Sequence, residues 1–217
     1  MSNLIIPARF ASTRLAEKLL QEIHGKSILQ RVYEQCLKVK NAKTIIAVDN
    51  ERLFDHAKSF GAEVMMTSKD HPNGTMRITE VVERLALDEN EIVVNVQADE
   101  PFLPPGNIEQ VINNLEQRPS ADMATLCEPI NEKRDVFDPS CVKVVMDHEG
   151  YAIYFSRAPI PYARDAFAKD IMPNDHQHYR HVGLYGYRAG FLRLLATLEA
   201  TPLERAESLE QLRVLYY

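Results

Sequence analysis

The stretch Ile92–Pro101, IVVNVQADEP, decides the expected fold class. Its first five residues are apolar at nearly every position, which is typical of a strand that is covered on both faces. Strands of that kind belong to parallel sheets with helices packed on either side. Three further apolar runs predict strands upstream, at Leu4–Ile6, Thr44–Val48 and Glu63–Met66.

Helical patterns separate these strands. Ser27 is a candidate N-cap, and the apolar residues after it fall on one helical stripe. Two later segments repeat the i, i+3, i+4, i+7 spacing of an amphipathic helix, beginning at Ile78 and at Ile108. Alternation of strands and helices predicts an α/β fold, a Rossmann-like arrangement with a mostly parallel sheet and right-handed crossovers.

The rhythm changes after about Met123. The segments MATLCEPI, VKVVMD and AIYFS are strand-like, whereas PIPYARD contains two prolines and predicts a loop. Two helices are expected near Gly190–Leu198 and Pro202–Leu215. We expect one domain whose parts are a nucleotide-binding half over about 1–122, antiparallel strands of a small dimerisation subdomain over about 123–190, and C-terminal helices over about 191–217.

Composition excludes several classes of function. The net charge of the 217 residues is −6, so a general nucleic-acid-binding surface is not expected. The three cysteines, Cys36, Cys127 and Cys141, fit no paired or metal-ligand spacing, which favours free thiols in a reducing compartment. No apolar run approaches the roughly 20 residues that span a bilayer, and no leader precedes the first strand. We therefore expect a cytoplasmic protein without a membrane anchor.

The opening loop carries an unusual concentration of positive charge. In IIPARFASTRLAEK, from Ile5 to Lys18, three cations follow a buried strand: Arg9, Arg14 and Lys18. Ligands of open α/β sheets bind where loops leave the carboxyl ends of the strands, and Asp99 follows another such strand. Three cations suit a triphosphate, and a carboxylate beside them suits Mg²⁺.

Simpler interpretations of both segments remain open. The cations fit ordinary surface charge, and the acidic pair Asp99–Glu100 fits a turn that caps the next helix. The chain has neither the G-x-x-x-x-G-K-[ST] motif nor G-x-G-x-x-G, which argues against P-loop NTPases and dinucleotide oxidoreductases.

A series of motifs resembles one family over the whole chain: IIPARFASTRL, NGTMRI, VNVQADEP, VKVVMD, YFSRAPIPYARD, RHVGLYGYR and LEQLRVL. In order and at similar spacing, they are those of the 3-deoxy-manno-octulosonate cytidylyltransferases, also called CMP-Kdo synthetases. The resemblance implies transfer of CMP from CTP to the anomeric hydroxyl of Kdo, with Mg²⁺, for lipopolysaccharide biosynthesis. It also implies a homodimer formed around YFSRAPIPY.

The resemblance further implies roles for individual residues. Lys18 and Asp99 would be catalytic, with Asp99 as the magnesium ligand. The residues expected at CTP are Arg9, Ser12, Arg14, Lys18 and Arg77, the last near the cytidine. Those expected at the sugar are Gln97, Arg164, His181, Tyr185, Glu210 and Gln211.

The sugar-site roles have plainer alternatives. His181 fits a core or turn histidine, Glu210 and Gln211 fit a solvated helix face, and one of Tyr185 and Tyr187 is expected to pack. The histidines at 176, 178 and 181 surround a probable loop–strand junction, and a transition-metal cluster is not expected there.

Three departures from the family pattern stand out. The usual loop R-L-P-G-K-P-L is replaced here, so that Ala16 and Glu17 stand where proline and glycine fix its shape, and Glu17 adds negative charge. Ala98 replaces the usual glycine before the acidic pair. The family continues for about thirty residues beyond position 217, with a second metal ligand, so we expect a missing tail and poor magnesium binding by the chain as given. The alternatives are a cytidylyltransferase for another acidic sugar and a non-catalytic nucleotide-binding relative.

Overall fold

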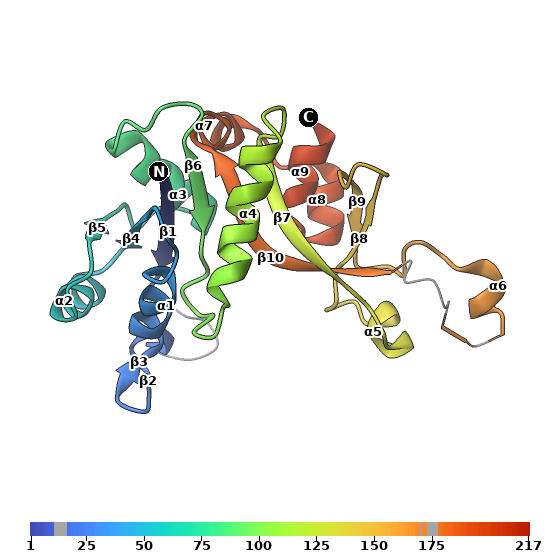
Figure 1. Cartoon of the computed structure of the whole chain (residues 1–217), viewed down its shortest axis with the longest axis horizontal. Helices are drawn as coiled ribbons and strands as arrows, with labels where there is room; N and C mark the ends of the chain where they lie inside the picture. The colour runs from blue at the N-terminus through green and yellow to red at the C-terminus, as the bar shows by residue number, and fades with distance from the viewer. Residues whose placement is uncertain (11–16, 170, 173–177) are drawn as a thin grey trace. The chain divides into compact units, whose positions relative to one another are not determined.

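The computed structural model describes residues 1–10, 17–169, 171–172 and 178–217 (Figure 1). The chain forms two compact units. The first comprises Met1–Ala124 and Leu184–Ala196, and the second comprises Thr125–Gly183 and Thr197–Tyr217. The first boundary lies close to the predicted change at residue 122, but the chain returns to the first unit at Leu184.

The sheet of the first unit contains the four strands predicted upstream. In spatial order they are β5 (Val64–Met66), β4 (Ala42–Val48), β1 (Ser2–Ala8) and β6 (Ile92–Asn95). These strands pair in parallel, and the last four residues of β10 (Tyr179–Arg188) pair with β6 in the antiparallel direction. The predicted mostly parallel sheet is confirmed. Its central residues, such as Ile5 and Ile46, are fully buried because helices cover both faces.

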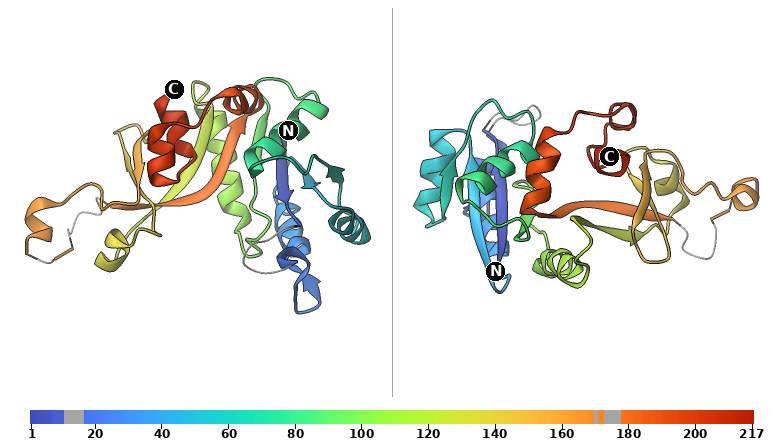
Figure 2. Two further views of the ribbon diagram at one scale, coloured as in Figure 1. Left: turned by 180° about the vertical axis from the view of Figure 1, so that it is seen from behind. Right: turned by 90° about the horizontal axis from the view of Figure 1, so that it is seen from above.

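The α-helices in the described part of this unit are α1 (Ile28–Cys36), α2 (Glu51–Ser59), α3 (Gly74–Arg84), α4 (Pro105–Gln117) and α7 (Ala189–Thr197). Helices α1 and α4 contact each other, and Thr79 of α3 donates a hydrogen bond to the Leu192 carbonyl of α7. The two pairs lie on opposite faces of the sheet (Figure 2).

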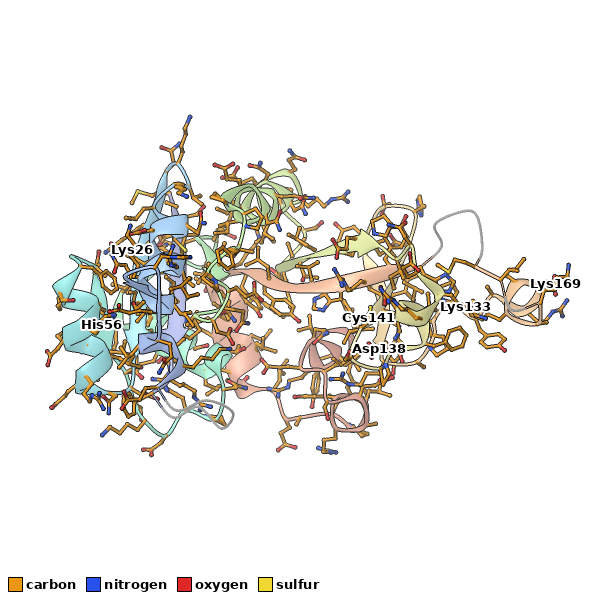
Figure 3. The ribbon with its side chains drawn as sticks, turned by 90° about the horizontal axis from the view of Figure 1, so that it is seen from below. Lys26, His56, Lys133, Asp138, Cys141 and Lys169 are labelled. Carbon is orange, nitrogen blue, oxygen red and sulfur yellow. The ribbon has the colours of Figure 1, made fainter. Side chains whose placement is uncertain are left out.

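Side-chain caps fix where the helices begin. Ser27 accepts a hydrogen bond from the Gln30 amide at 3.1 Å, which confirms the predicted N-cap of α1. Nε2 of His56, on α2, lies 2.7 Å from the same hydroxyl. Figure 3 labels His56 together with Lys26, which precedes the cap. Between β1 and α1 lie a short 3₁₀ helix, η1 (Lys18–Leu20), and the two-stranded ribbon of β2 (Glu22–Ile23) and β3 (Lys26–Ser27).

The second unit is built on antiparallel strands. β8 (Lys143–Met146) pairs with β9 (Ala152–Ser156) and with the start of β10, and β7 (Met123–Pro129) pairs with β10. These are the three strand-like segments expected after residue 123. Val144 and Phe155 pack with Leu209 and Leu212 in the core of this unit.

Short helices complete the second unit: α5 (Lys133–Phe137), α6 (Arg164–Phe167), α8 (Pro202–Glu207) and α9 (Gln211–Tyr216). The prediction of a single helix at Pro202–Leu215 is wrong in one respect. The structure has two helices there, and the chain breaks between them at Ser208, whose φ of 52° is left-handed. The break turns Leu209 and Leu212 into the core, and Arg213 joins the two helices by donating to both carboxylate oxygens of Glu204.

A buried lysine organises the start of β8. The Lys143 side chain has no exposed surface, and its Nζ donates to the carbonyls of Asp138 and Arg157 at 2.8 and 2.7 Å. Burial lowers the pKa of this ammonium, while nearby acidic groups oppose that shift. Figure 3 labels Asp138 and Cys141 in this region.

Cys36, Cys127 and Cys141 are free thiols, as predicted. Burial raises the pKa of the Cys36 thiol to about 12, so this cysteine acts as a core residue. Within the described part of the chain, no helix is both long and apolar enough to cross a membrane.

Close packing of β10 against α4 gives a test of the fold. A Cβ added at Gly186 would lie 2.4 Å from Cγ1 of Val111 and 3.1 Å from Cδ1 of Leu115. We expect Gly186→Ala to lower the free energy of unfolding by about 1–3 kcal/mol because of this overpacking, measured by chemical denaturation.

Gly183→Ala is the matched control, because nothing lies within 4 Å of a Cβ at that position of the same strand. Val111→Ala removes the group that Gly186→Ala would meet. The double variant is expected to lose less stability than the sum of the single losses. Additive losses would contradict this packing.

Candidate functional site

Two neighbouring strands of the first unit bring together the opening loop and the acidic pair. β1 and β6 are parallel, with Leu4 opposite Val94, so both chains leave the sheet at the same edge. Nζ of Lys18 donates a hydrogen bond to Oδ2 of Asp99 there. The two side chains are 36% and 45% exposed, which leaves both charges accessible to a ligand. One predicted cation and the predicted carboxylate thus lie in direct contact.

The carboxylates at this edge suit a hard divalent cation. Asp99 is exposed, and Glu100 follows it. The pKa of Glu100 is raised because its own carboxyl is desolvated and because the charge of Asp99 lies nearby. Among the described residues no three potential ligands form a ready metal cluster. Mg²⁺, however, is commonly held by one or two carboxylates together with substrate phosphates, and the exposed Asp99 has the ligand chemistry that this ion prefers.

Arg77 is a buried support of this edge. Its guanidinium has no exposed surface and donates to Oδ2 of Asp49 at 3.1 Å, to the Ser68 carbonyl at 3.2 Å and to the Thr67 hydroxyl. Oδ1 of Asp49 accepts a hydrogen bond from the Phe10 amide at 2.9 Å. One ion pair therefore connects the segments that follow β1, β4 and β5. This geometry gives Arg77 a supporting role, and its predicted place near the cytidine stays a prediction.

Arg9 is held by the loop that precedes α3. It donates to the carbonyl of His71, and Nε2 of His71 lies 2.6 Å from Oε2 of Glu80. The same carboxylate oxygen accepts from the Ser68 amide at 2.9 Å. Burial lowers the pKa of Arg77 and the nearby charge of Arg9 lowers it further, while Asp49 opposes both. Arg9 is thus close enough for its positive charge to act on the Arg77 guanidinium. The predicted Ser12 and Arg14 lie outside the described residues.

Two of the predicted sugar-site residues belong to the first unit. Gln97 is half-buried just after β6, where its carbonyl accepts from the Glu100 amide at 3.3 Å. Tyr185 lies on β10 opposite Asn95, and its ring stacks on Tyr187 with a centroid separation of 6.1 Å. Tyr187 is buried, which confirms that one of the two tyrosines packs.

The other predicted sugar-site residues belong to the second unit. Arg164 is almost fully exposed and pairs with Asp165 at 3.1 Å. Gln211 is buried rather than on a solvated face, and Glu210 precedes it at the N-cap of α9. A pocket of about 330 Å³ also lies in this unit, and none of these predicted residues is among its described lining residues. Those are Glu128, Pro129, Ile130, Asn131, Glu132, Asp135, Cys141 and Arg180.

His181 is half-buried within the second unit. Its Nε2 lies 2.9 Å from the Thr125 hydroxyl, whose proton is donated to the Val182 carbonyl, and its ring packs edge-on to Phe155. Burial lowers the pKa of His181 to about 4, so the imidazole is neutral at physiological pH. His178 is buried as well, with Nε2 2.7 Å from the Pro161 carbonyl. The third histidine, at 176, lies outside the described residues.

Several residues that build this site escaped sequence reasoning. Asp49 accepts a hydrogen bond from the Phe10 amide, and the Thr67 hydroxyl accepts one from Arg77. Glu80 accepts from the Ser68 amide and contacts the His71 ring. A weak signal existed for Asp49, because it follows a predicted strand directly, as Asp99 nearly does. Glu80 offered no signal, since it lies on a helix among ordinary charged positions.

The buried ion pair predicts a large stability effect. Arg77→Met leaves the Asp49 carboxylate, 12% exposed, without its charged partner. We expect a loss of about 3–5 kcal/mol in the free energy of unfolding, measured by chemical denaturation. Arg77→Met combined with Asp49→Asn removes the unpaired charge, and is expected to be more stable than Arg77→Met alone. A loss below about 1 kcal/mol for Arg77→Met, the range of an exposed pair, would contradict this role.

His181 predicts a specific dependence of stability on pH. Its pKa is about 4 in the folded protein, below the ordinary histidine value of 6.5, so the unfolded chain binds the proton first as pH falls. The contribution of neutral His181 to the free energy of unfolding is fully present above pH 6.5. It falls by about 3 kcal/mol in total as the pH is lowered toward 4. His181→Gln is expected to flatten the curve of unfolding free energy over that range. His148→Gln, in an exposed turn, serves as control, and parallel curves for wild type and His181→Gln would exclude the effect.

Comparison with known proteins agrees with this geometry. The cytidylyltransferase family model matches residues 3–217. The 3-deoxy-manno-octulosonate cytidylyltransferase of Aliivibrio salmonicida is 51% identical, over 99% of this chain and 86% of the relative. The enzyme of the same name from Idiomarina loihiensis is 50% identical, over 99% of this chain and 86% of its own.

A solved structure extends the likeness to three dimensions. CMP:2-keto-3-deoxy-manno-octonic acid synthetase complexed with CTP is similar with a TM-score of 0.90 and 37% identity, over 100% of this chain and 86% of that chain. The motifs, the sheet with its Lys18–Asp99 pair and these likenesses agree, and the chain belongs to the 3-deoxy-manno-octulosonate cytidylyltransferase family.

Proposed function

We propose that this protein transfers CMP from CTP to the anomeric hydroxyl of 3-deoxy-D-manno-octulosonate, giving CMP-Kdo and pyrophosphate. The observation that carries the proposal is the contact between Lys18 and Asp99 where β1 and β6 leave the sheet. In a chain of this family, this contact supports a phosphate-binding role for Lys18 and a metal-binding role for Asp99.

The reaction forms a bond between the sugar oxygen and the α-phosphorus, and it breaks the bond from that phosphorus to the bridging oxygen of pyrophosphate. Negative charge grows on the leaving oxygens and the proton of the sugar hydroxyl is lost. Catalysis of such a step depends mainly on positioning and on fixed positive charge. Lys18 and Arg9 supply that charge from the segment after β1, and the Asp49–Arg77 pair holds this segment in place.

Asp99 is the residue proposed to hold Mg²⁺. It contacts Lys18, the cation proposed to bind the triphosphate. Mg²⁺ would supply positive charge at the phosphates and would lower the pKa of a coordinated hydroxyl. Of the residues predicted at the sugar, Gln97 and Tyr185 of the first unit are proposed to contact it. The roles predicted for Arg164, His181, Glu210 and Gln211 remain predictions.

The biological setting is part of the same proposal. The product would serve lipopolysaccharide assembly, and the three free thiols favour the cytoplasm. A homodimer would form through the second unit. β9 is the last strand in the order of its sheet and exposes Ile153, which suits pairing across a two-fold axis.

The proposal predicts a large effect of Asp99→Asn. With CTP, Kdo and Mg²⁺, release of pyrophosphate is expected to fall at least about a hundredfold, because a charge that acts in the transition state is removed. The melting temperature is expected to stay close to that of the wild type, since Asp99 is exposed. Asp55→Asn, on an exposed position of α2, is the control.

The same assay distinguishes the alternatives. Turnover with another acidic sugar and none with Kdo would show that the proposed substrate is wrong and that the other sugar is used. Binding of CTP without turnover in the presence of any such sugar would indicate a non-catalytic relative. Full activity of Asp99→Asn would overturn the assignment of this carboxylate.

A further inference from the structure

Glu17, immediately before the phosphate-binding lysine, has an unusual backbone conformation. Its φ of 51° and ψ of 33° are left-handed, a region that disfavours residues with a Cβ. It precedes η1, which begins at Lys18. A glutamate in this position is both strained and close to where negatively charged phosphates would bind.

Arg52, in the first turn of α2, holds this glutamate. NH2 of Arg52 donates to Oε2 of Glu17 at 3.0 Å, and NH1 donates to Oε1, so the pair is bidentate. The guanidinium also lies over the ring of Phe10, 5.2 Å from its centroid. Arg52 therefore contacts both Phe10, after β1, and Glu17, before η1.

The pair contributes little to global stability. Arg52 and Glu17 are 62% and 37% exposed, and ion pairs between exposed side chains are weak and screened by salt. Its importance lies in where it holds a negative charge. Without Arg52, the carboxylate of Glu17 is free to approach the ammonium of Lys18, its neighbour in sequence. It would then compete with phosphate for that cation and repel the triphosphate.

We propose that Arg52 is a positioning residue that draws the carboxylate of Glu17 away from the bound triphosphate and so preserves affinity for CTP. The inference rests on the proposed function, because it assumes that Lys18 binds the phosphates of CTP. Glu17 is one of the residues at which this chain departs from the usual loop sequence. Arg52, on helix α2, neutralises the negative charge that Glu17 introduces.

The experiment is a double-mutant cycle on CTP. Arg52→Ala is expected to raise the KM for CTP roughly three- to fivefold, with kcat and the KM for Kdo unchanged. In a Glu17→Gly background, the same Arg52→Ala change is expected to have no effect, because no carboxylate remains to be held. Glu17→Gly alone is expected to have a KM for CTP no higher than that of the wild type, since glycine adopts a positive φ without strain.

Two further measurements separate positioning from a general loss of charge. Lys43→Ala removes one positive charge from the pair with Glu63 at the start of β4, and is expected to leave the KM for CTP unchanged. The effect of Arg52→Ala is expected to shrink at high ionic strength, because it acts between exposed charges. Calorimetric titration with CTP in the absence of sugar gives a readout that needs no turnover.

The outcomes are distinct. An equal rise in KM in both backgrounds, no rise in either, or a matching rise with Lys43→Ala would overturn the role of Arg52 while the wild type still turns over CTP and Kdo. A wild type that neither binds CTP nor releases pyrophosphate would overturn the proposed function, and the role of Arg52 with it.

Discussion

The buried ion pair between Asp49 and Arg77 is the interaction on which the functional edge of the first unit depends. A guanidinium with no exposed surface is tolerated only when it is paired and hydrogen-bonded. Here it finds its partners on the segments after β4 and β5, and the carboxylate of Asp49 continues the network to the Phe10 amide after β1. The segments that follow three strand ends are thereby held together.

The described charges at this edge are paired. Lys18 contacts Asp99, Glu17 contacts Arg52, and Arg9 donates to the carbonyl of His71. Among the residues that the structure describes, these cations therefore have partners whose contacts are exposed to solvent, and such contacts are weak. Under the proposed function, a triphosphate and a metal ion would carry charges that match both members of the Lys18–Asp99 pair, so binding would exchange one set of ionic contacts for another.

Elements with a clear local hydrophobic pattern were predicted well from the sequence, and elements shaped by distant packing were not. The four parallel strands of the first unit were predicted within about two residues, because strands buried on both faces form continuous apolar runs. The helix expected at Pro202–Leu215 was divided at Ser208 because Leu209 and Leu212 pack in the core of the second unit, which propensity does not reveal. The sugar-site residues were placed by resemblance alone, and for them the structure shows a neutral, half-buried His181 and a buried Gln211.

The sequence by itself determined the α/β class and the family, and it predicted that Lys18 and Asp99 would share one edge if their strands were neighbours. Only the tertiary structure decided which groups hold that edge. Asp49 and Arg77 are separated by 28 positions and Glu17 and Arg52 by 35, and neither pair follows a local period. Hydrophobic periodicity reports which face of an element is buried. It does not report which distant charge that element will meet, because that depends on how strand order brings the loops together.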